Sequence, residues 1–339
     1  MYRVLRLDDP SVTDEQWQEY YRLLEQLYEK YLSPMARDGW QATRDRIQSS
    51  FRLQTGHNKL VVYDGEKMIA WIGLRIVDLG TPNAQGLFSG DAIAEPLPPE
   101  FAQVCAPELA RILKEANCER ALMIGSTSRS DDIGRALHGE RLGTVEKYRL
   151  YRDKANYEVM DRWLTEIPQQ NHNLAPIFFE FVPEEHEVRF AELMGLFVND
   201  MPTATDRKTG SKHSFTVEEG RSQAIWRRAN NVHLYTYALL DQGRLIAFSN
   251  TRISGSDPTH VWQLLTGVDR SYRGRGLSKW LKAAMFRKVG EDFPENVSFF
   301  TQMREVNLPI QEVNKAMGYV LESRGGEYSI TLEGLLSVR

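Results

Sequence analysis

The clearest pattern along the chain is a pair of apolar strands joined by a polar turn, and it occurs twice. The first pair occupies residues 60–71 and turns at Asp64-Gly65. The second occupies residues 234–248 and turns at Gln242-Gly243. Apolar residues on both sides of a turn that contains glycine favour a β-hairpin, because glycine readily adopts the backbone conformations that tight turns need. The pattern therefore predicts two hairpins at equivalent places in two halves of the chain.

Other features recur at a similar interval of roughly 170 to 180 residues. A helix that ends at a glycine is expected before Gly139 and again before Gly318. An apolar strand follows each helix, around residues 145–151 and 328–332. Features that repeat in the same order at one interval indicate a tandem duplication.

The second half alternates between strands and helices. The predicted order is a strand at 177–182, helices at 185–199 and 217–230, the hairpin, a strand at 260–268, a helix at 277–289, a strand at 297–302, a helix at 309–317 and a final strand. Mixed order of this kind predicts an α/β fold, with a mixed α+β sheet and helices on both faces. The expected domains are residues 1–153 and 176–339, joined by a linker at 154–175.

Composition limits the class of protein. The chain has 339 residues, 42% hydrophobic and 26% charged, so two ordinary domains can each bury a core. The net charge of -4 argues against nucleic acid as a partner, and the lack of a long apolar run argues against a membrane. Cys105 and Cys118 are too few for a disulfide scaffold, and the 7 histidines lack metal-ligand spacing. We expect a cytoplasmic monomer or homodimer without a metal.

The strongest chemical signal is the stretch 268–282, where an apolar strand leads through a loop directly into a helix. The loop contains Gly274 and Gly276 together with Arg273 and Arg275. Backbone N–H groups at a helix N-terminus, glycines without a Cβ and arginine side chains together can bind phosphate groups. A solvated basic turn is the alternative interpretation of this loop taken alone.

This loop resembles the acyl-CoA pyrophosphate loop of the GNAT acetyltransferase superfamily. The matching run is Arg273-Gly274-Arg275-Gly276-Leu277-Ser278, and its last residue replaces the family's glycine or alanine. The resemblance implies that this run binds the pyrophosphate of acyl-CoA.

Two further segments resemble the same family. Thr266 and Val268 fit its fourth strand, whose backbone pairs with the pantetheine arm. Asn307 and Asn314, followed by Gly318-Tyr319, resemble its second motif, in which an asparagine lies beside the cofactor. Tandem copies of the fold occur in the family, as in mycothiol synthase. The resemblance thus implies two tandem GNAT-like domains, each a mostly antiparallel sheet with helices on both faces.

The resemblance also implies a reaction. It points to an acyl-CoA-dependent N-acyltransferase, with acetyl-CoA as the expected co-substrate and a small amine as the acceptor. In this fold two central strands diverge, and the amine attacks the thioester between them in a ternary complex. Two alternatives stay open: a CoA-binding regulatory or interaction protein without turnover, and an ordinary α/β protein with a basic turn. A protein N-terminus or lysine as the acceptor also stays open.

The first half lacks an equivalent loop. At the corresponding place, residues 89–101, the sequence has no arginine-glycine run. Prolines have no N–H to donate, and carboxylates repel a diphosphate. The residues concerned are Pro96, Pro98, Pro99, Asp91, Glu95 and Glu100. The first domain is therefore expected not to bind CoA in the usual way, and to shape the acceptor site or to serve as a structural partner.

Candidates for proton transfer carry weaker signals. The position of the family's tyrosine acid is Asn314, whose amide cannot deliver a proton in that role. We consider Asp200, His260 and Tyr328 as candidate catalytic residues. Their structural alternatives are a helix-end acid, a loop histidine and a packed aromatic residue. Residues 203–212, after Asp200, have the composition of a lid over the acceptor.

Overall fold

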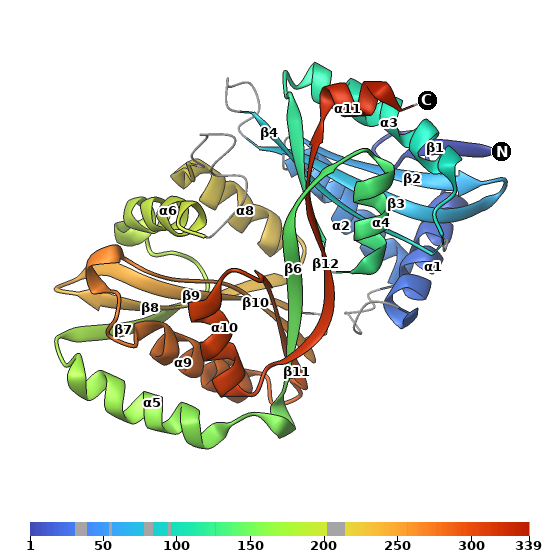
Figure 1. Ribbon diagram of the computed structural model, residues 1–339. Helices are drawn as coiled ribbons and strands as arrows, with labels where there is room; N and C mark the ends of the chain where they lie inside the picture. Colours follow the sequence, from blue (N-terminus) through green and yellow to red (C-terminus); the bar gives the residue numbers. More distant parts are fainter. Residues whose placement is uncertain are drawn as a thin grey trace. The chain divides into compact units, whose positions relative to one another are not determined.

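The computed structural model describes residues 1–30, 39–53, 56–77, 84–93, 96–125, 127–201, 214–255 and 257–338 (Figure 1). The chain divides into two compact units. Unit 1 consists of Met1–Glu146 together with Ser323–Arg339, and unit 2 consists of Lys147–Glu322.

Unit 1 is built on a mostly antiparallel sheet. Its strands lie in the order β1-β2-β3-β4-β5-β12, and β4 and β5 are parallel. Its elements are β1 (Tyr2–Arg6), α1 (Asp14–Lys30), α2 (Gly39–Leu53), β2 (His57–Asp64), β3 (Lys67–Val77), β4 (Gln85–Ala92), α3 (Pro99–Glu115), β5 (Arg120–Ile124), α4 (Ser128–Ala136), the first part of β6 (Glu140–Tyr151), the last part of β12 (Val320–Thr331) and α11 (Leu332–Ser337).

Successive residues of the strands in unit 1 point to opposite faces, and helices cover both. Leu60 and Val62 of β2 belong to a buried cluster with α3 and α4. Val61 and Tyr63, which alternate with them, belong to a second cluster that contains Trp17 of α1. The sheet is therefore a layer between two sets of helices.

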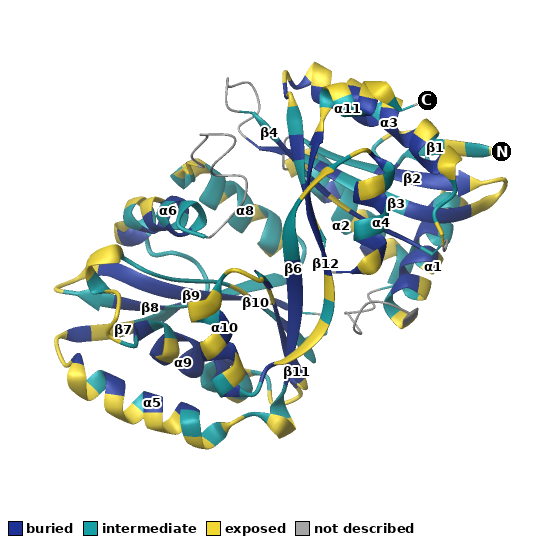
Figure 2. Ribbon diagram, in the orientation of Figure 1, coloured by how far each residue is buried: buried dark blue, intermediate teal, exposed yellow. Residues whose placement is uncertain are grey.

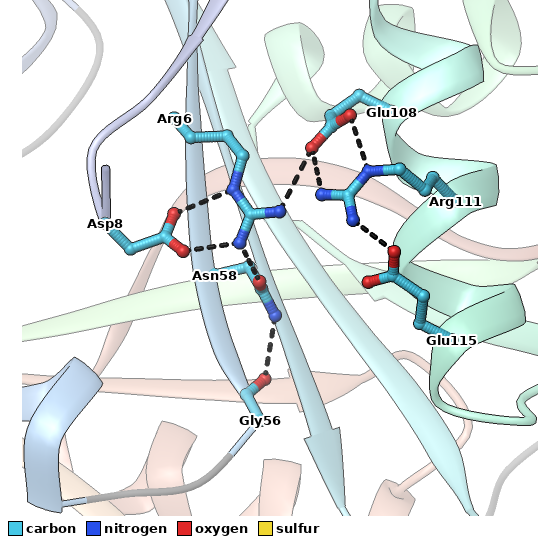
Figure 3. A network of polar contacts seen from close by, with 7 residues as sticks. All are labelled: Arg6, Asp8, Gly56, Asn58, Glu108, Arg111 and Glu115. Atoms are coloured by element: carbon cyan, nitrogen blue, oxygen red, sulfur yellow. Dashed lines mark hydrogen bonds and ion pairs between the residues drawn. The ribbon is translucent and has the colours of Figure 1, made fainter. Parts of the chain in front are cut away.

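A network of polar contacts around Arg6 joins β1, β2 and α3 (Figure 3). The guanidinium of Arg6 pairs with Asp8, pairs with Glu108 at 3.2 Å, and donates to Oδ1 of Asn58 at 3.1 Å. Glu108 also pairs with Arg111, one helical turn further along α3, at 2.6 Å. Partly exposed ion pairs contribute little energy singly, so this network mainly fixes how the chain after β1 lies against α3.

Unit 2 repeats the plan of unit 1. Its strands lie in the order β6-β11-β10-β9-β8-β7, and β10 and β11 are parallel. Its elements are the last part of β6, η1 (Arg152–Lys154), α5 (Tyr157–Gln170), β7 (Leu174–Phe179), α6 (Glu184–Asn199), α8 (Val217–Ala229), β8 (Val232–Asp241), β9 (Arg244–Ser254), β10 (His260–Val268), η2 (Arg270–Tyr272), α9 (Leu277–Asp292), β11 (Ser298–Arg304), α10 (Leu308–Met317) and the start of β12.

Helices also cover both faces of the sheet in unit 2. Phe248 of β9 stacks on Phe190 of α6, with ring centroids 4.7 Å apart. The preceding residue, Ala247, belongs instead to the cluster that contains Trp280 of α9 and Trp163 of α5. Figure 2 shows the result as buried strands, with helices that expose one side.

The structure confirms the predicted fold class, because each unit has a mixed, mostly antiparallel sheet with helices on both faces. It also confirms both hairpins, β2–β3 and β8–β9. The turn residues Gly65 and Gly243 have φ of +60° and +80°, which explains why glycine occupies these positions.

The boundaries between the units differ from the predicted ones. The predicted final strand of the second domain lies in unit 1, where Glu327 to Thr331 of β12 pair with β5. Conversely, the last residues of β6 lie in unit 2, next to β11. The predicted linker at 154–175 contains α5, whose buried Met160 and Trp163 belong to the core of unit 2. Neither unit is therefore the continuous segment 1–153 or 176–339.

Candidate functional site

The glycine-rich loop of unit 2 has the conformation that its sequence predicts. It follows β10 through η2 and enters α9 at Gly276, the N-cap residue, which has no side chain to cap the helix. Gly274 and Gly276 have φ of +80° and +76°, where residues with a Cβ are strained. A Cβ on Gly274 would meet no atom within 4 Å. The first amides of α9 thus face an open loop at the positive end of the helix dipole.

Polar contacts hold this loop in place. Asp269 accepts a hydrogen bond from the backbone N–H of Ser271 at 3.1 Å and pairs with Arg189 of α6. Tyr272 donates its hydroxyl hydrogen to Oδ2 of Asp241 at 2.6 Å. Because these contacts form within the protein, the loop is ordered before any ligand binds.

Two of the three arginines of the loop share one carboxylate partner, and the third has none in the described structure. Arg270 and Arg273 both pair with Asp200, and Nε of Arg273 also donates to the carbonyl oxygen of Val268 at 3.1 Å. Arg275 is exposed, and its guanidinium lies over the ring of Tyr272 at 5.0 Å. Within the described part of the chain Arg275 has no carboxylate partner, so it can pair with an incoming anion.

Asp200 therefore lies against the loop, and its carboxylate is bound by two guanidinium groups. It is the C-cap residue of α6, and its side chain is 13% exposed. Hydrogen bonds from Arg270, then from Arg273, hold the pKa of Asp200 below its usual value. In this arrangement Asp200 organises the loop, whereas the sequence suggested an acid facing the acceptor. Residues 203–212, the expected lid, lie outside the described residues.

We expect Asp200→Asn to weaken the binding of CoA. Loss of the charge removes the contacts that fix Arg270 and Arg273, and the resulting loss of loop order should outweigh the removal of a negative charge near the diphosphate. The dissociation constant for CoA should therefore rise roughly three- to tenfold, or about 1 kcal/mol. Calorimetry measures this change directly. Glu187→Gln is a matched control, because Glu187 lies on the same helix and pairs with Arg221 away from the loop. If Asp200→Asn instead raised the KM of the acceptor alone, Asp200 would have the role that the sequence suggested.

The two central strands of unit 2 diverge. β10 pairs with β11 over three residues, from His260 to Trp262, and then continues beside β9 alone. The register with β9 shifts between Gln263 and Thr266, which marks a bulge in β10. Beyond Trp262 one edge of β10 therefore has no strand partner in the described sheet, and a bulge re-aims its backbone N–H groups there.

The residues of the predicted second motif lie at the two ends of α10. Asn307 is the N-cap residue, and Gly318 ends the helix with φ of +99°. Asn314 is fully buried; its Nδ2 lies 3.7 Å from the sulfur of Met303, and its Oδ1 has no hydrogen-bond partner in the described structure. A buried acceptor without a donor is uncommon, and a ligand N–H would satisfy it.

The remaining catalytic candidates, His260 and Tyr328, have separate surroundings. His260 begins β10, eight residues before Val268 and therefore about 26 Å along the strand. Its Nδ1 lies 2.8 Å from Oγ of Ser298, and burial lowers the pKa of the imidazole. Tyr328 belongs to unit 1, where its buried hydroxyl donates to Oδ1 of Asp131 at 2.6 Å. Within unit 2, His260 is therefore far along β10 from the loop that Asp200 contacts, whereas Tyr328 has its hydrogen-bond partner within unit 1.

One buried group was not identified from the sequence. The amine of Lys282, on α9, is 1% exposed and donates to Oε1 of Gln263. Tyr319 donates its hydroxyl hydrogen to the same oxygen at 2.8 Å. Burial lowers the pKa of Lys282 to about 7. The available signal was a lysine within the apolar run of α9 that extends from Leu281 to Phe286.

The two central strands of unit 1 also diverge, but its sequence lacks the arginine-glycine loop. β4 pairs with β5 over three residues from Gly86 to Phe88, yet its register with β3 is continuous, without a bulge. The helix that corresponds to α9 is α3, whose N-cap and first residues are Pro98 and Pro99. Neither has an N–H, so this helix start is a poor site for an anion. Ala94 and Glu95 are outside the described residues.

The part of the chain that the structure describes has neither a metal site nor a membrane-spanning helix. It contains no group of three or more His, Cys, Asp or Glu residues arranged to hold a metal ion. It also contains no helix with the length and hydropathy needed to cross a membrane.

The comparisons with known proteins give matches among solved structures. No family model and no curated protein matches the sequence. A tandem GNAT protein from the clavulanic acid biosynthesis pathway matches with a TM-score of 0.70 at 17% identity, over 98% of both chains. A GCN5-related N-acetyltransferase from Sphaerobacter thermophilus matches with a TM-score of 0.61 at 12% identity, over 98% of this chain and 95% of that one.

A third structure contains a GCN5-related glucosamine N-acetyltransferase region of a fungal multi-domain β-N-acetylglucosaminidase. It matches with a TM-score of 0.63 at 10% identity, over 97% of this chain and 38% of that one. At these identities the likeness shows the fold, and the loop, the divergence of β10 from β11 and the repeated plan agree with it. The chain has the fold of the tandem GNAT proteins.

Proposed function

We propose that unit 2 binds acyl-CoA, with acetyl-CoA as the expected donor, and transfers the acyl group to an amine. The observation that supports this most strongly is the combination in one unit of an open glycine loop at the start of α9 and a free edge of β10. A helix N-terminus binds phosphate, and a strand edge offers backbone groups to an extended amide chain. CoA carries both chemical features.

The residues present fit this co-substrate. In the proposal, the amides of the loop and the guanidinium of Arg275 bind the diphosphate. The backbone of Thr266 and Val268 pairs with the pantetheine arm, and the unpartnered Oδ1 of Asn314 accepts a hydrogen bond from it. Leu277 is buried and anchors the first turn of α9 to the core, which keeps the amides aimed at the loop.

Acyl-CoA supplies an activated thioester, so the protein needs to orient the two reactants and stabilise developing charge. Backbone N–H groups at the bulge of β10 polarise the thioester carbonyl. The acceptor nitrogen then forms a bond to the carbonyl carbon, and the carbon–sulfur bond breaks with its electron pair on sulfur. The proton that leaves nitrogen ends on sulfur or in water, so the products are an amide and CoA.

A CoA-binding protein without turnover is the second candidate. The observation in its favour is Asn314, which occupies the position of the family's acid and cannot deliver a proton. The two functions predict the same binding but differ in whether the acyl group leaves.

The test is an assay of free thiol, with acetyl-CoA and a panel of primary amines, amino sugars and peptides with free N-termini. We expect release of thiol that depends on the acceptor. The mass of the acceptor should increase by about 42 Da, because an acetyl group replaces a hydrogen. At low acetyl-CoA, an Arg275→Ala variant should lose both signals. Tight binding of CoA without release across the panel would favour the regulatory function. Failure to bind CoA would contradict both.

A further inference from the structure

The buried amine of Lys282 is the most unusual ionisable group in unit 2. Its side chain is 1% exposed, on the face of α9 that packs on the sheet. Its hydrogen-bond partner is an amide, Oε1 of Gln263, and the ring of Tyr319 lies 5.4 Å from its nitrogen. Among the described residues no carboxylate pairs with it. A buried lysine without an acid partner disfavours its own charged form, and such groups concentrate at functional sites.

The elements that pack against α9 confirm that this environment has no compensating charge. These elements include α5, α10, β8, β9 and β10. Tyr235 and Tyr237 of β8 pack against the buried cluster that contains Trp280 of α9, and burial raises the pKa of both phenols. The acid of α5 that contacts α9, Asp161, is exposed and pairs with Arg287. The groups that contact the amine are therefore the neutral amide of Gln263 and the ring of Tyr319.

The amine of Lys282 lies next to the point where β10 and β11 part, because its partner is Gln263. Gln263 is the first residue after the last pair between β10 and β11, and the bulge begins at it. It lies five residues before Val268, about 16 Å along the strand from the start of the loop. Gln263 also donates to Oγ of Ser249 at 3.4 Å, and Ser249 contacts Oγ1 of Thr266 at 2.8 Å. Lys282 is thus connected to both ends of the bulge.

We propose that Lys282 supplies the positive charge that stabilises the thiolate of CoA as the acyl group leaves, acting across Gln263 at the point where β10 and β11 part. This inference rests on the proposed function. Lys282 is a positioning and charge-supplying residue, because its amine contacts Gln263 and acts through it. A charge in a poorly hydrated site acts on a neighbouring charge far more strongly than in water.

The amine of Lys282 and the thiol of bound CoA shift each other's pKa by the same amount. A thiolate near the amine favours the ammonium form of Lys282, and the ammonium favours the thiolate to the same extent. When bound CoA loses its thiol proton, the amine takes one up, so sulfur becomes negative and nitrogen positive with no net loss of protons. This arrangement assigns a function to a lysine that would otherwise only destabilise the fold.

The test measures the pKa of the thiol of bound CoA, which needs no acceptor. The thiolate absorbance of CoA in the ultraviolet is followed against pH with saturating wild-type protein and with a Lys282→Met variant. We expect the bound thiol to titrate at least one pH unit lower in the wild type than in Lys282→Met. Lys282→Arg should retain most of the shift, and Lys288→Met, on the exposed side of α9, should leave it unchanged.

A second ligand distinguishes loss of the charge of Lys282 from a general change in the binding site. Desulfo-CoA, which has hydrogen in place of the thiol, should bind wild type and Lys282→Met with affinities that agree within twofold. Equal thiol pKa values in the two proteins would overturn the role of Lys282 while leaving acyl-CoA binding intact. If Lys282→Met did not fold, a thiol pKa in the wild-type complex equal to that of free CoA would overturn it as well. Failure of both ligands to bind would contradict the proposed function instead.

Discussion

Gly276→Asp is expected to weaken the binding of CoA by more than 100-fold while the fold survives. A carboxylate at the N-cap of α9 accepts hydrogen bonds from the amides that would otherwise bind the diphosphate, and it adds a negative charge at the same place. The substitution favours the helix, which offsets the strain of a Cβ at φ of +76°. The added Cβ would lie 3.2 Å from the end of the flexible side chain of Ile167, which can move.

Calorimetry with CoA measures the affinity, and circular dichroism checks the fold. Gly65→Asp is the matched control, because Gly65 also has a positive φ, is open to solvent and receives the same charge, but lies in the β2–β3 hairpin of unit 1. It should bind CoA like the wild type. An unchanged affinity in a folded Gly276→Asp protein would show that the loop is not the diphosphate site.

Lys282→Met is expected to stabilise the protein, and to do so most at low pH. Burial lowers the pKa of Lys282 from 10.5 to about 7, so the folded state binds fewer protons than the unfolded state between these values. The destabilisation is fully present below pH 7, falls as pH rises from 7 to 10.5, and is absent above. A shift of this size corresponds to on the order of 5 kcal/mol, part of which the lost hydrogen bond to Gln263 offsets.

We therefore expect Lys282→Met to be more stable than the wild type by about 2 kcal/mol or more at pH 6, and the difference to vanish near pH 10. Denaturant unfolding at a series of pH values measures it. Lys288→Met is the control on the same helix, since its amine is 35% exposed and pairs with Asp292. A difference between Lys282→Met and wild type that is independent of pH would mean that Lys282 keeps an ordinary pKa.

The sequence predicts those parts of the structure that depend on local chemistry. The hairpins follow from apolar residues on both sides of a glycine turn, and the loop follows from Gly274 and Gly276 directly before a helix. In both cases the residues that determine the conformation are neighbours in the chain. The start of α6, predicted at 185, is observed at Glu184 for the same reason, because Pro183 precedes it.

Features that depend on contacts distant in the sequence could not be predicted in this way. The pairing of β12 with β5 joins residues about 200 positions apart, and no local pattern distinguishes it from pairing within the second half. Asp200 looked like a free acid because Arg270 and Arg273, which bind it, are some 70 residues further along the chain. The low exposure of Lys282 likewise results from the elements packed around α9.

The number of CoA molecules bound per chain distinguishes the two units, and calorimetric titration of the 339-residue chain measures it. Unit 2 offers amides at the start of α9, whereas the corresponding helix of unit 1 begins at Pro98 and Pro99. We predict one site per chain, which Gly276→Asp removes. Two equivalent sites would contradict the difference between the units, and no binding at millimolar CoA would contradict the assignment of the loop itself.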